Sequence, residues 1–182
     1  SDLDRVREEA ERVVETVRRS NKEVKKKLDR ELKRLRDSNK DVVDKIKRVL
    51  EKLRELIKRR KEKEEVVDTV RKLVEEVRRK LDEVLKRNRE LIRRLLEELD
   101  KVNKRNKELA EEVVRKLEKV ARERNVGGEI EEVRDKLRKV VEESSKHAEE
   151  VKRDLERVVE ESTRNVDRVR EDLKRVLDEI ET

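Results

Sequence analysis

The chain has 182 residues, of which 58% are charged and 31% apolar, with no aromatic residue, cysteine or proline. The lack of cysteine excludes disulfides and thiolate metal sites, and no run approaches the ~18 consecutive apolar residues of a membrane span. The net charge of +7 is a modest excess of 56 basic over 49 acidic residues, mixed along the chain. Without aromatic side chains to stack on bases, we expect no nucleic-acid partner, and we expect no membrane partner.

The apolar residues recur with a period of 18 along the whole chain. Examples are Val6, Val24 and Val42; Val66, Val84, Val102 and Val120; and Val133, Val151 and Val169. One such repeat makes five turns of an α-helix, so the stripe runs straight along the helix and forces no left-handed supercoil. A narrow apolar face on a highly charged chain therefore favours long helices packed in a thin bundle over disorder.

The first helix is expected over about residues 2–60. Apolar positions stop at Ile57 and resume at Val66, and residues 58–65 between them are all charged. Every residue of this segment is a good helix former, and none is a typical turn residue. The segment is therefore interpreted either as a loop or as uninterrupted helix, and the sequence leaves both open.

The second helix is expected over about residues 65–125 and the third over about residues 129–181. Between them, Gly127 and Gly128 form the predicted loop, because glycines tolerate the positive φ that commonly ends a helix. The apolar stripe of the third helix runs from Ile130 to Ile180. Together the three helices are expected to form a single domain over residues 1–182.

Uncharged polar residues interrupt the apolar stripes in two sets. The first set is Ser20, Asn21, Asn103, Asn106, Ser144, Ser145 and His147, and the second is Ser38, Asn39, Asn88, Ser162, Thr163 and Asn165. Most members of one set lie one repeat away from a member of the other. Because buried polar groups need hydrogen-bond partners, we predict two structural polar layers, about 27 Å apart by the helical rise.

Residue numbers predict how the helices pair. The numbers of Asn21 and Asn106 add up to 127, as do those of Asn39 and Asn88. Antiparallel helices that place both pairs level are centred within residues 58–65, which is the boundary between the first two helices.

The same arithmetic applies to the second and third helices. The numbers of Asn106 and His147 add up to 253, as do those of Asn88 and Asn165, and the corresponding centre lies beside Gly127. The sequence therefore predicts an all-α protein: a long, straight, antiparallel three-helix bundle with up-down-up topology.

Two arrangements satisfy the pairing of the first two helices. They can fold back on each other within one chain, or residues 2–125 can form one continuous helix that pairs with a second copy in a domain-swapped homodimer. The missing turn residues favour the swapped dimer, and the missing apolar residues in 58–65 favour an exposed hairpin tip.

The straight 18-residue repeat, the Val/Leu/Ile core, the Glu/Lys/Arg surface and the paired Ser-Asn positions resemble parametrically designed de novo helical bundles with engineered hydrogen-bond networks. The resemblance covers the whole chain. It implies a scaffold, or an assembly or recognition module, without catalytic activity. The chain departs from this class at residues 58–65, where designed bundles normally carry Asp, Ser, Gly or Pro as caps and loop residues.

His147 is the only histidine, and it is the main candidate for chemistry as a general base, metal ligand or pH switch. Asn165 stands one repeat later, which favours a hydrogen-bonding role in a polar layer for His147 as well. One histidine without cysteine makes a poor metal site, and the repeated serines have no strained turn or oxyanion hole beside them. We therefore predict no catalytic, cofactor-binding or metal-binding residue, and no cofactor.

These features lead us to expect a designed structural scaffold that is not an enzyme, with its register specified by the two polar layers. The alternative is a helical interaction or assembly module, either a homodimer or a groove that accepts a designed partner helix. The sequence shows no signal peptide or transmembrane segment, so we expect a soluble protein suited to recombinant cytoplasmic expression. No partner is required in the first case.

Overall fold

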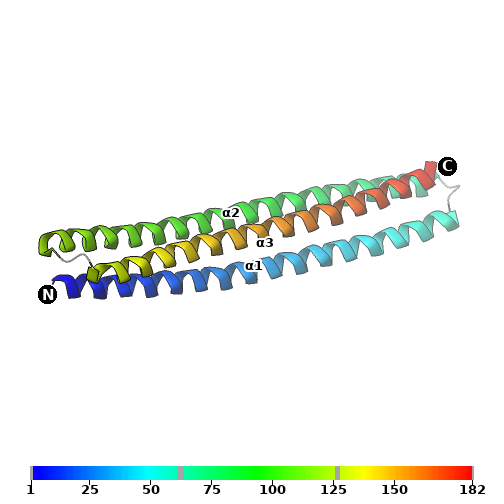
Figure 1. Cartoon of the computed structure of the whole chain (residues 1–182). Coiled ribbons are helices and arrows are strands. Elements are labelled where there is room, and N and C mark those ends of the chain that lie inside the picture. Colours follow the sequence, from blue (N-terminus) through cyan, green and yellow to red (C-terminus); the bar gives the residue numbers. More distant parts are fainter. Residues whose placement is uncertain (1, 61–63, 126–127, 182) are drawn as a thin grey trace. The chain divides into compact units, whose positions relative to one another are not determined.

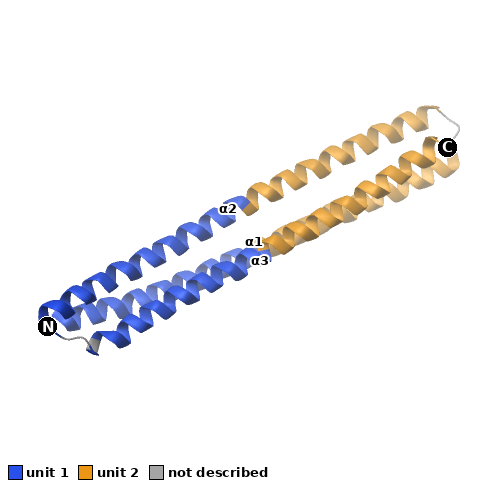
Figure 2. Ribbon diagram, turned by 45° about the horizontal axis from the view of Figure 1, so that its top comes forward, with its two compact units in different colours: residues 1–30, 93–154 blue, residues 31–92, 155–182 orange. Residues whose placement is uncertain are grey.

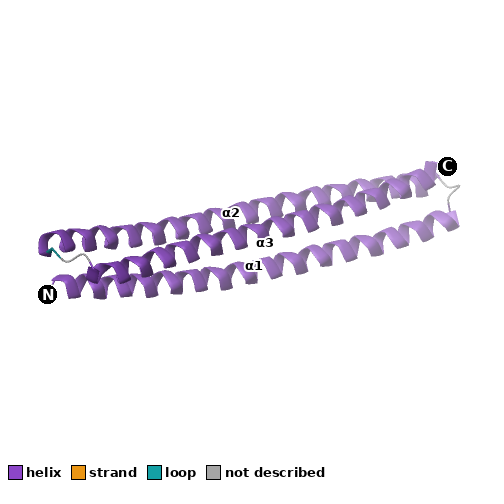
Figure 3. Ribbon diagram, in the orientation of Figure 1, coloured by secondary structure: helices purple, strands orange, loops and turns teal. Residues whose placement is uncertain are grey.

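The computed structural model describes residues 2–60, 64–125 and 128–181. They form three helices: α1 (Asp2–Arg60, 59 residues), α2 (Glu64–Arg124, 61 residues) and α3 (Gly128–Glu181, 54 residues) (Figure 1). No strand occurs in these ranges (Figure 3). The all-α class and the three-helix bundle predicted from the sequence are therefore confirmed.

The chain divides into two compact units, coloured separately in Figure 2. Unit 1 comprises residues 1–30 and 93–154, and unit 2 comprises residues 31–92 and 155–182. Each unit contains one segment from each of α1, α2 and α3. Each unit is consequently a three-helix bundle in its own right, and the expectation of a single domain over residues 1–182 stays a prediction.

Ion pairs between helices define their directions in unit 1. Between α1 and α2 the pairs are Glu9–Lys116 and Lys27–Glu98, and between α2 and α3 they are Asp100–Lys152 and Glu118–Arg134. In each series the residue numbers rise on one helix as they fall on the other. The α2 segment is therefore antiparallel to both α1 and α3.

Unit 2 has the same topology. Between α2 and α3, Arg71 pairs with Glu181 and Asp82 pairs with Arg170, so the two segments are antiparallel. Between α1 and α2, Asn88 is hydrogen-bonded to Asn39. The numbers of these two residues have the same sum as those of Asn21 and Asn106, a hydrogen-bonded pair in unit 1.

Each unit has its own core of aliphatic side chains. In unit 1 the core includes Leu117 (0% exposed) and Leu137 (1%), and in unit 2 it includes Leu81 (0%) and Leu173 (0%). Burying a leucine side chain contributes about 1.5–3 kcal/mol, so this repeated stripe supplies most of the driving force for packing. Among the described residues no large apolar side chain is exposed, and no described helix is long and apolar enough to cross a membrane.

The end of α2 differs from its prediction. The residue with a positive φ is Asn125 (φ 54°), and Gly128 does not have a positive φ. Gly128 is the first residue of α3 instead of part of a loop, and Gly127 lies outside the described residues. Asparagine takes this role because, after glycine, it is the residue that most readily adopts the left-handed conformation at a helix C-terminus.

The connection predicted at residues 58–65 falls partly within helices. α1 continues to Arg60 and α2 begins at Glu64, while residues 61–63 lie outside the described residues. In both units the α1 and α2 segments of one chain pair with each other. The domain-swapped dimer stays a prediction that a mass measurement decides.

We predict that Asn125→Gly keeps or raises stability, whereas Asn125→Val lowers it by about 1–2 kcal/mol because a β-branched side chain clashes in the left-handed conformation. Chemical unfolding followed by circular dichroism measures both changes. Glu123→Val, at an exposed position within α2, is the matched control and should cost only the helix propensity of about 0.5 kcal/mol. Equal losses for the two valine variants would contradict the prediction.

We predict a molar mass in solution close to the 22.1 kDa of one chain, because the α1–α2 contacts are satisfied within the chain. Light scattering coupled to size exclusion measures this mass. A Gly/Ser-rich insertion between Lys61 and Glu64 should leave the protein a monomer, because added loop length costs little. Twice the mass for the parent chain, falling to one chain after the insertion, would establish the swapped dimer instead.

Candidate functional site

The polar layer of unit 2 is a buried three-residue hydrogen-bond network. The Nδ2 of Asn88 donates to the Oδ1 of Asn39 at 2.8 Å and to the Oγ of Ser162 at 3.1 Å. The three residues come from α2, α1 and α3 and are 8%, 8% and 6% exposed. An asparagine amide has two hydrogens, and the two acceptors on the neighbouring helices use both of them.

The layer of unit 1 adds a fourth residue. The Nδ2 of Asn106 donates to the Oδ1 of Asn21 at 3.1 Å. The Oγ of Ser144 lies 3.2 Å from this same oxygen and 3.0 Å from the Oδ1 of Asn103. Since a hydroxyl has one hydrogen, Ser144 fully donates to only one of these two acceptors at a time. Asn103 has no polar counterpart in unit 2, because the residue one repeat before it is Leu85.

An apolar layer occupies the equivalent place one repeat further along unit 2. Ile57, Val70 and Ile180 take the places of Asn39, Asn88 and Ser162 on the same three helices, and they are 4%, 0% and 8% exposed. All three belong to the unit 2 core. The site on each helix thus accepts either an apolar or a hydrogen-bonded side chain, so the asparagines are not required for filling space.

Five residues of the predicted sets, besides His147, are outside both networks. Ser38, Ser145 and Thr163 are exposed, and Ser20 and Asn165 are half-buried. Thr163 donates to the carbonyl oxygen of Val159 on its own helix at 2.9 Å. The physical reason is angular: a residue next to a buried one is turned by about 100° around the helix and so leaves the core.

His147 contributes none of the hydrogen bonds of the unit 1 network. It follows Ser144 by three residues, which turns it about 60° from that serine toward α1. Its Nε2 is buried and has no hydrogen-bond partner among the described residues. Burial, together with the positive charge of Lys25 on α1, lowers the pKa of His147, while Glu150 on α3 and Asp29 on α1 act in the opposite direction.

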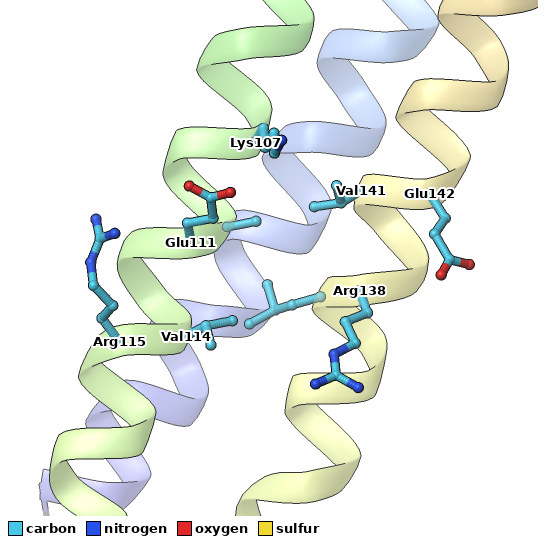
Figure 4. A pocket seen from close by; sticks show the side chains of 9 residues that line it. Lys107, Glu111, Val114, Arg115, Arg138, Val141 and Glu142 are labelled. Atoms are coloured by element: carbon cyan, nitrogen blue, oxygen red, sulfur yellow. The ribbon is translucent and has the colours of Figure 1, made fainter.

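A shallow apolar groove lies between α2 and α3 in unit 1 (Figure 4). Val114 on α2 and Val141 on α3 line it, together with Ala110 and Leu137. Its charged neighbours are Lys107, Glu111, Arg115, Arg138 and Glu142. The labelled heads of Arg115, Arg138 and Glu142 point away from the space between the two valines.

The 18-residue repeat explains this groove. Ala110 stands where Ile92 and Val74 stand in the other repeats of α2, and Val114 stands where Leu96 stands. Smaller side chains leave the contact between α2 and α3 incompletely filled at this point. The sequence signal for the groove is the smaller side-chain volume at these two positions of the repeat.

The described residues contain no group of three or more His, Asp or Glu side chains arranged to hold a metal ion. The chemistry that the two layers can perform is hydrogen bonding between helices, with neutral amides and hydroxyls as both donors and acceptors.

No protein-family model matches the chain, and no curated protein matches it either. Among solved structures, the chain is similar to one described as "Computationally designed three helix bundle", with 20% sequence identity and a TM-score of 0.46. The alignment covers 98% of this chain and 84% of that one.

We predict that His147 makes stability fall with acidification. Because folding lowers the pKa of His147, the unfolded chain binds the proton more readily than the folded chain. The stability is therefore full above the ordinary histidine pKa of about 6.5 and declines as the pH drops below it. Urea unfolding of the parent chain and of His147→Asn at about pH 7.5 and pH 5.5 measures the difference.

Carboxylates change protonation in the parent chain and in the variant alike. The relevant quantity is therefore the difference between the two proteins in the unfolding free energy lost from about pH 7.5 to about pH 5.5, and we expect the smaller loss for His147→Asn. Asn165→His places a histidine at the equivalent position of the next repeat and is the matched control for adding or removing an imidazole. An equal loss of stability in the parent chain and in His147→Asn would contradict the role of His147.

Proposed function

We propose that the chain is a designed structural scaffold without catalytic activity, in which the two buried polar layers specify the register of the helices. The supporting observation is that positions one 18-residue repeat apart hold hydrogen-bonded residues in some layers and apolar residues in another. Hydrogen-bonded triads occupy two of them, and the apolar triad Ile57, Val70 and Ile180 occupies the next.

The order of the layers opposes slippage by one 18-residue repeat. If α2 moved by one repeat in one direction, Asn39 would meet Asn106, but Asn88 would be placed against Ile57. In the other direction, Asn21 would meet Asn88, but Asn39 would be placed against Val70. A buried amide left without a partner costs about 1–3 kcal/mol, so each slipped register is penalised although its aliphatic stripes still match.

The unfolding free energies of variants in unit 2 test whether its polar layer is hydrogen-bonded. We predict that Asn88→Val lowers the free energy of unfolding by about 1–3 kcal/mol, since it leaves the Oδ1 of Asn39 buried and unpaired. The triple variant Asn39→Ile/Asn88→Val/Ser162→Ile copies the apolar layer and should be at least as stable as the parent chain. Urea unfolding measures all three proteins. A triple variant less stable than Asn88→Val would contradict a hydrogen-bonded layer.

Register requires a separate measurement. In the native register Lys27 and Glu98 are in contact, with 2.7 Å between Nζ and Oε1. We therefore expect a Lys27→Cys/Glu98→Cys variant to react with a short bis-maleimide, and Lys27→Cys/Lys116→Cys, which reports a one-repeat slip, to react far less. Converting both layers to the apolar triad should raise the yield of the slipped cross-link. An unchanged cross-link pattern after both conversions would overturn the role of the layers in register.

The second candidate function is a helical interaction module. It is favoured by half-buried aliphatic residues beside the contact between α1 and α2 in unit 2. They flank the α1–α2 contact on both helices, with Val42, Val49 and Leu56 on α1 and Leu73, Val84 and Leu91 on α2. Between α1 and α3, the groove beside the polar layer has Val43 and the polar Asn165 in its lining.

A further inference from the structure

Ion pairs between helices follow the same 18-residue repeat as the core. Between α2 and α3 they are Glu118–Arg134 and Asp100–Lys152 in unit 1 and Asp82–Arg170 in unit 2. Between α1 and α2 they are Glu9–Lys116, with 2.8 Å between Oε1 and Nζ, and Lys27–Glu98. Each step moves one repeat up one helix and one repeat down the other.

The α1–α2 series is interrupted in unit 2. The position one repeat after Lys27 on α1 is Lys45, and the position one repeat before Glu98 on α2 is Lys80. The hydrogen bond between Asn39 and Asn88 keeps the register of the series in this unit, so the two lysines occupy the place of an ion pair. Both are exposed, and neither makes an ion pair within the described residues. The α2–α3 series continues through unit 2 without such a replacement.

Half-buried aliphatic side chains adjoin both lysines. On α1, Lys45 lies three residues after Val42 and four before Val49, which places all three on one helical face. On α2, Lys80 lies seven residues after Leu73 and four before Val84. The side chains of Val42, Val49 and Leu73 pack against the unit 2 core and stay partly accessible.

We propose that this face of unit 2, formed by Lys45 and Lys80 with the adjoining aliphatic residues, binds an amphipathic helix that carries acidic residues beside its apolar stripe. This inference rests on the interaction-module candidate and is independent of the scaffold proposal. A partner carboxylate between the two lysines supplies the negative charge that Glu9 and Glu98 supply in the rest of the series.

Charge complementarity selects this partner over a second copy of the chain. A symmetric dimer through the same face would bring the lysines of both copies together, and like charges in contact oppose association. The acidic residues one turn before each lysine, Asp41 and Glu76, form no ion pair with them among the described residues. The two ammonium groups therefore remain available to a partner.

The probe is a synthetic peptide of about four heptads with Leu at both apolar positions and Glu at both flanking positions. The control peptide has Lys in place of every flanking Glu. Fluorescence anisotropy with the full chain measures the affinity of each peptide at low and at physiological salt. We expect the Glu peptide to bind more tightly than the Lys peptide, with a preference that weakens as salt rises.

Charge reversal on the chain gives the decisive comparison. Lys80→Glu completes the ion-pair series with Lys45 and should weaken binding of the Glu peptide by on the order of tenfold, while the unfolding midpoint is kept or raised. Lys45→Glu/Lys80→Glu should reverse the preference, so that the Lys peptide binds more tightly. The matched control is Arg168→Glu/Lys174→Glu, which makes the same change in net charge at exposed positions of α3.

Three outcomes would overturn the proposal. They are equal affinity for both peptides, an equal loss of binding in the α3 control, and self-association of the parent chain that Lys80→Glu does not alter. The cross-linking test of register does not involve Lys45 or Lys80, so loss of peptide binding with a normal cross-link pattern rejects the docking face alone. An unchanged cross-link pattern after conversion of both layers would reject the role of the layers in register alone, because Lys45 and Lys80 would still occupy the place of an ion pair.

Discussion

In each unit, one asparagine of α2 donates a hydrogen bond to an asparagine of α1 within a polar layer. Asn88 donates to Asn39 and also to Ser162, and Asn106 donates to Asn21, which Ser144 also approaches. A buried amide loses its solvation by water, and only a partner at the correct height restores its hydrogen bonds. We propose that this requirement aligns the helices, because aliphatic stripes with an 18-residue repeat still match after a shift of one repeat.

The aliphatic core and the polar layers have separate physical roles. The core, with residues such as Leu81 and Leu117, supplies a driving force proportional to the apolar area that is buried. It discriminates poorly between registers because the same residue types recur every five turns. The layers contribute little net stability, since replacing a hydrogen-bonded group by an aliphatic one of similar shape is often neutral. Their proposed contribution is the energy by which wrong alignments are disfavoured.

The exposed ion pairs between helices also favour one register, but each contributes less energy than a polar layer. Exposed ion pairs such as Lys27–Glu98 are worth about 0.2–1 kcal/mol each, so they support a register without determining it. Their regularity makes an exception visible, and Lys45 facing Lys80 is such an exception. An exposed pair of like charges costs the isolated chain little stability, which is compatible with the proposed role of the two lysines in binding a partner carboxylate.

Much of the fold could be predicted from the sequence because helix periodicity and strong helix formers are local properties. The pairing of Asn21 with Asn106 and of Asn39 with Asn88 also followed from residue numbers, since antiparallel helices convert a constant sum into equal height. The positions next to the layers could not be assigned in this way. Ser38 and Ser145 are exposed because one residue turns the side chain by about 100°, and a pattern of polar letters does not record that angle.

The sequence by itself determined the helical class, the helix directions and the asparagines that meet, because these depend on spacing along one chain. Only the tertiary structure decided which side of the core each flanking residue faces. It left the buried Nε2 of His147 without a partner in the unit 1 network, and it gave the left-handed position at the end of α2 to Asn125. These outcomes depend on which neighbour lies opposite a side chain and on how a helix end meets the next segment. Both are properties of three packed helices and not of any single stripe.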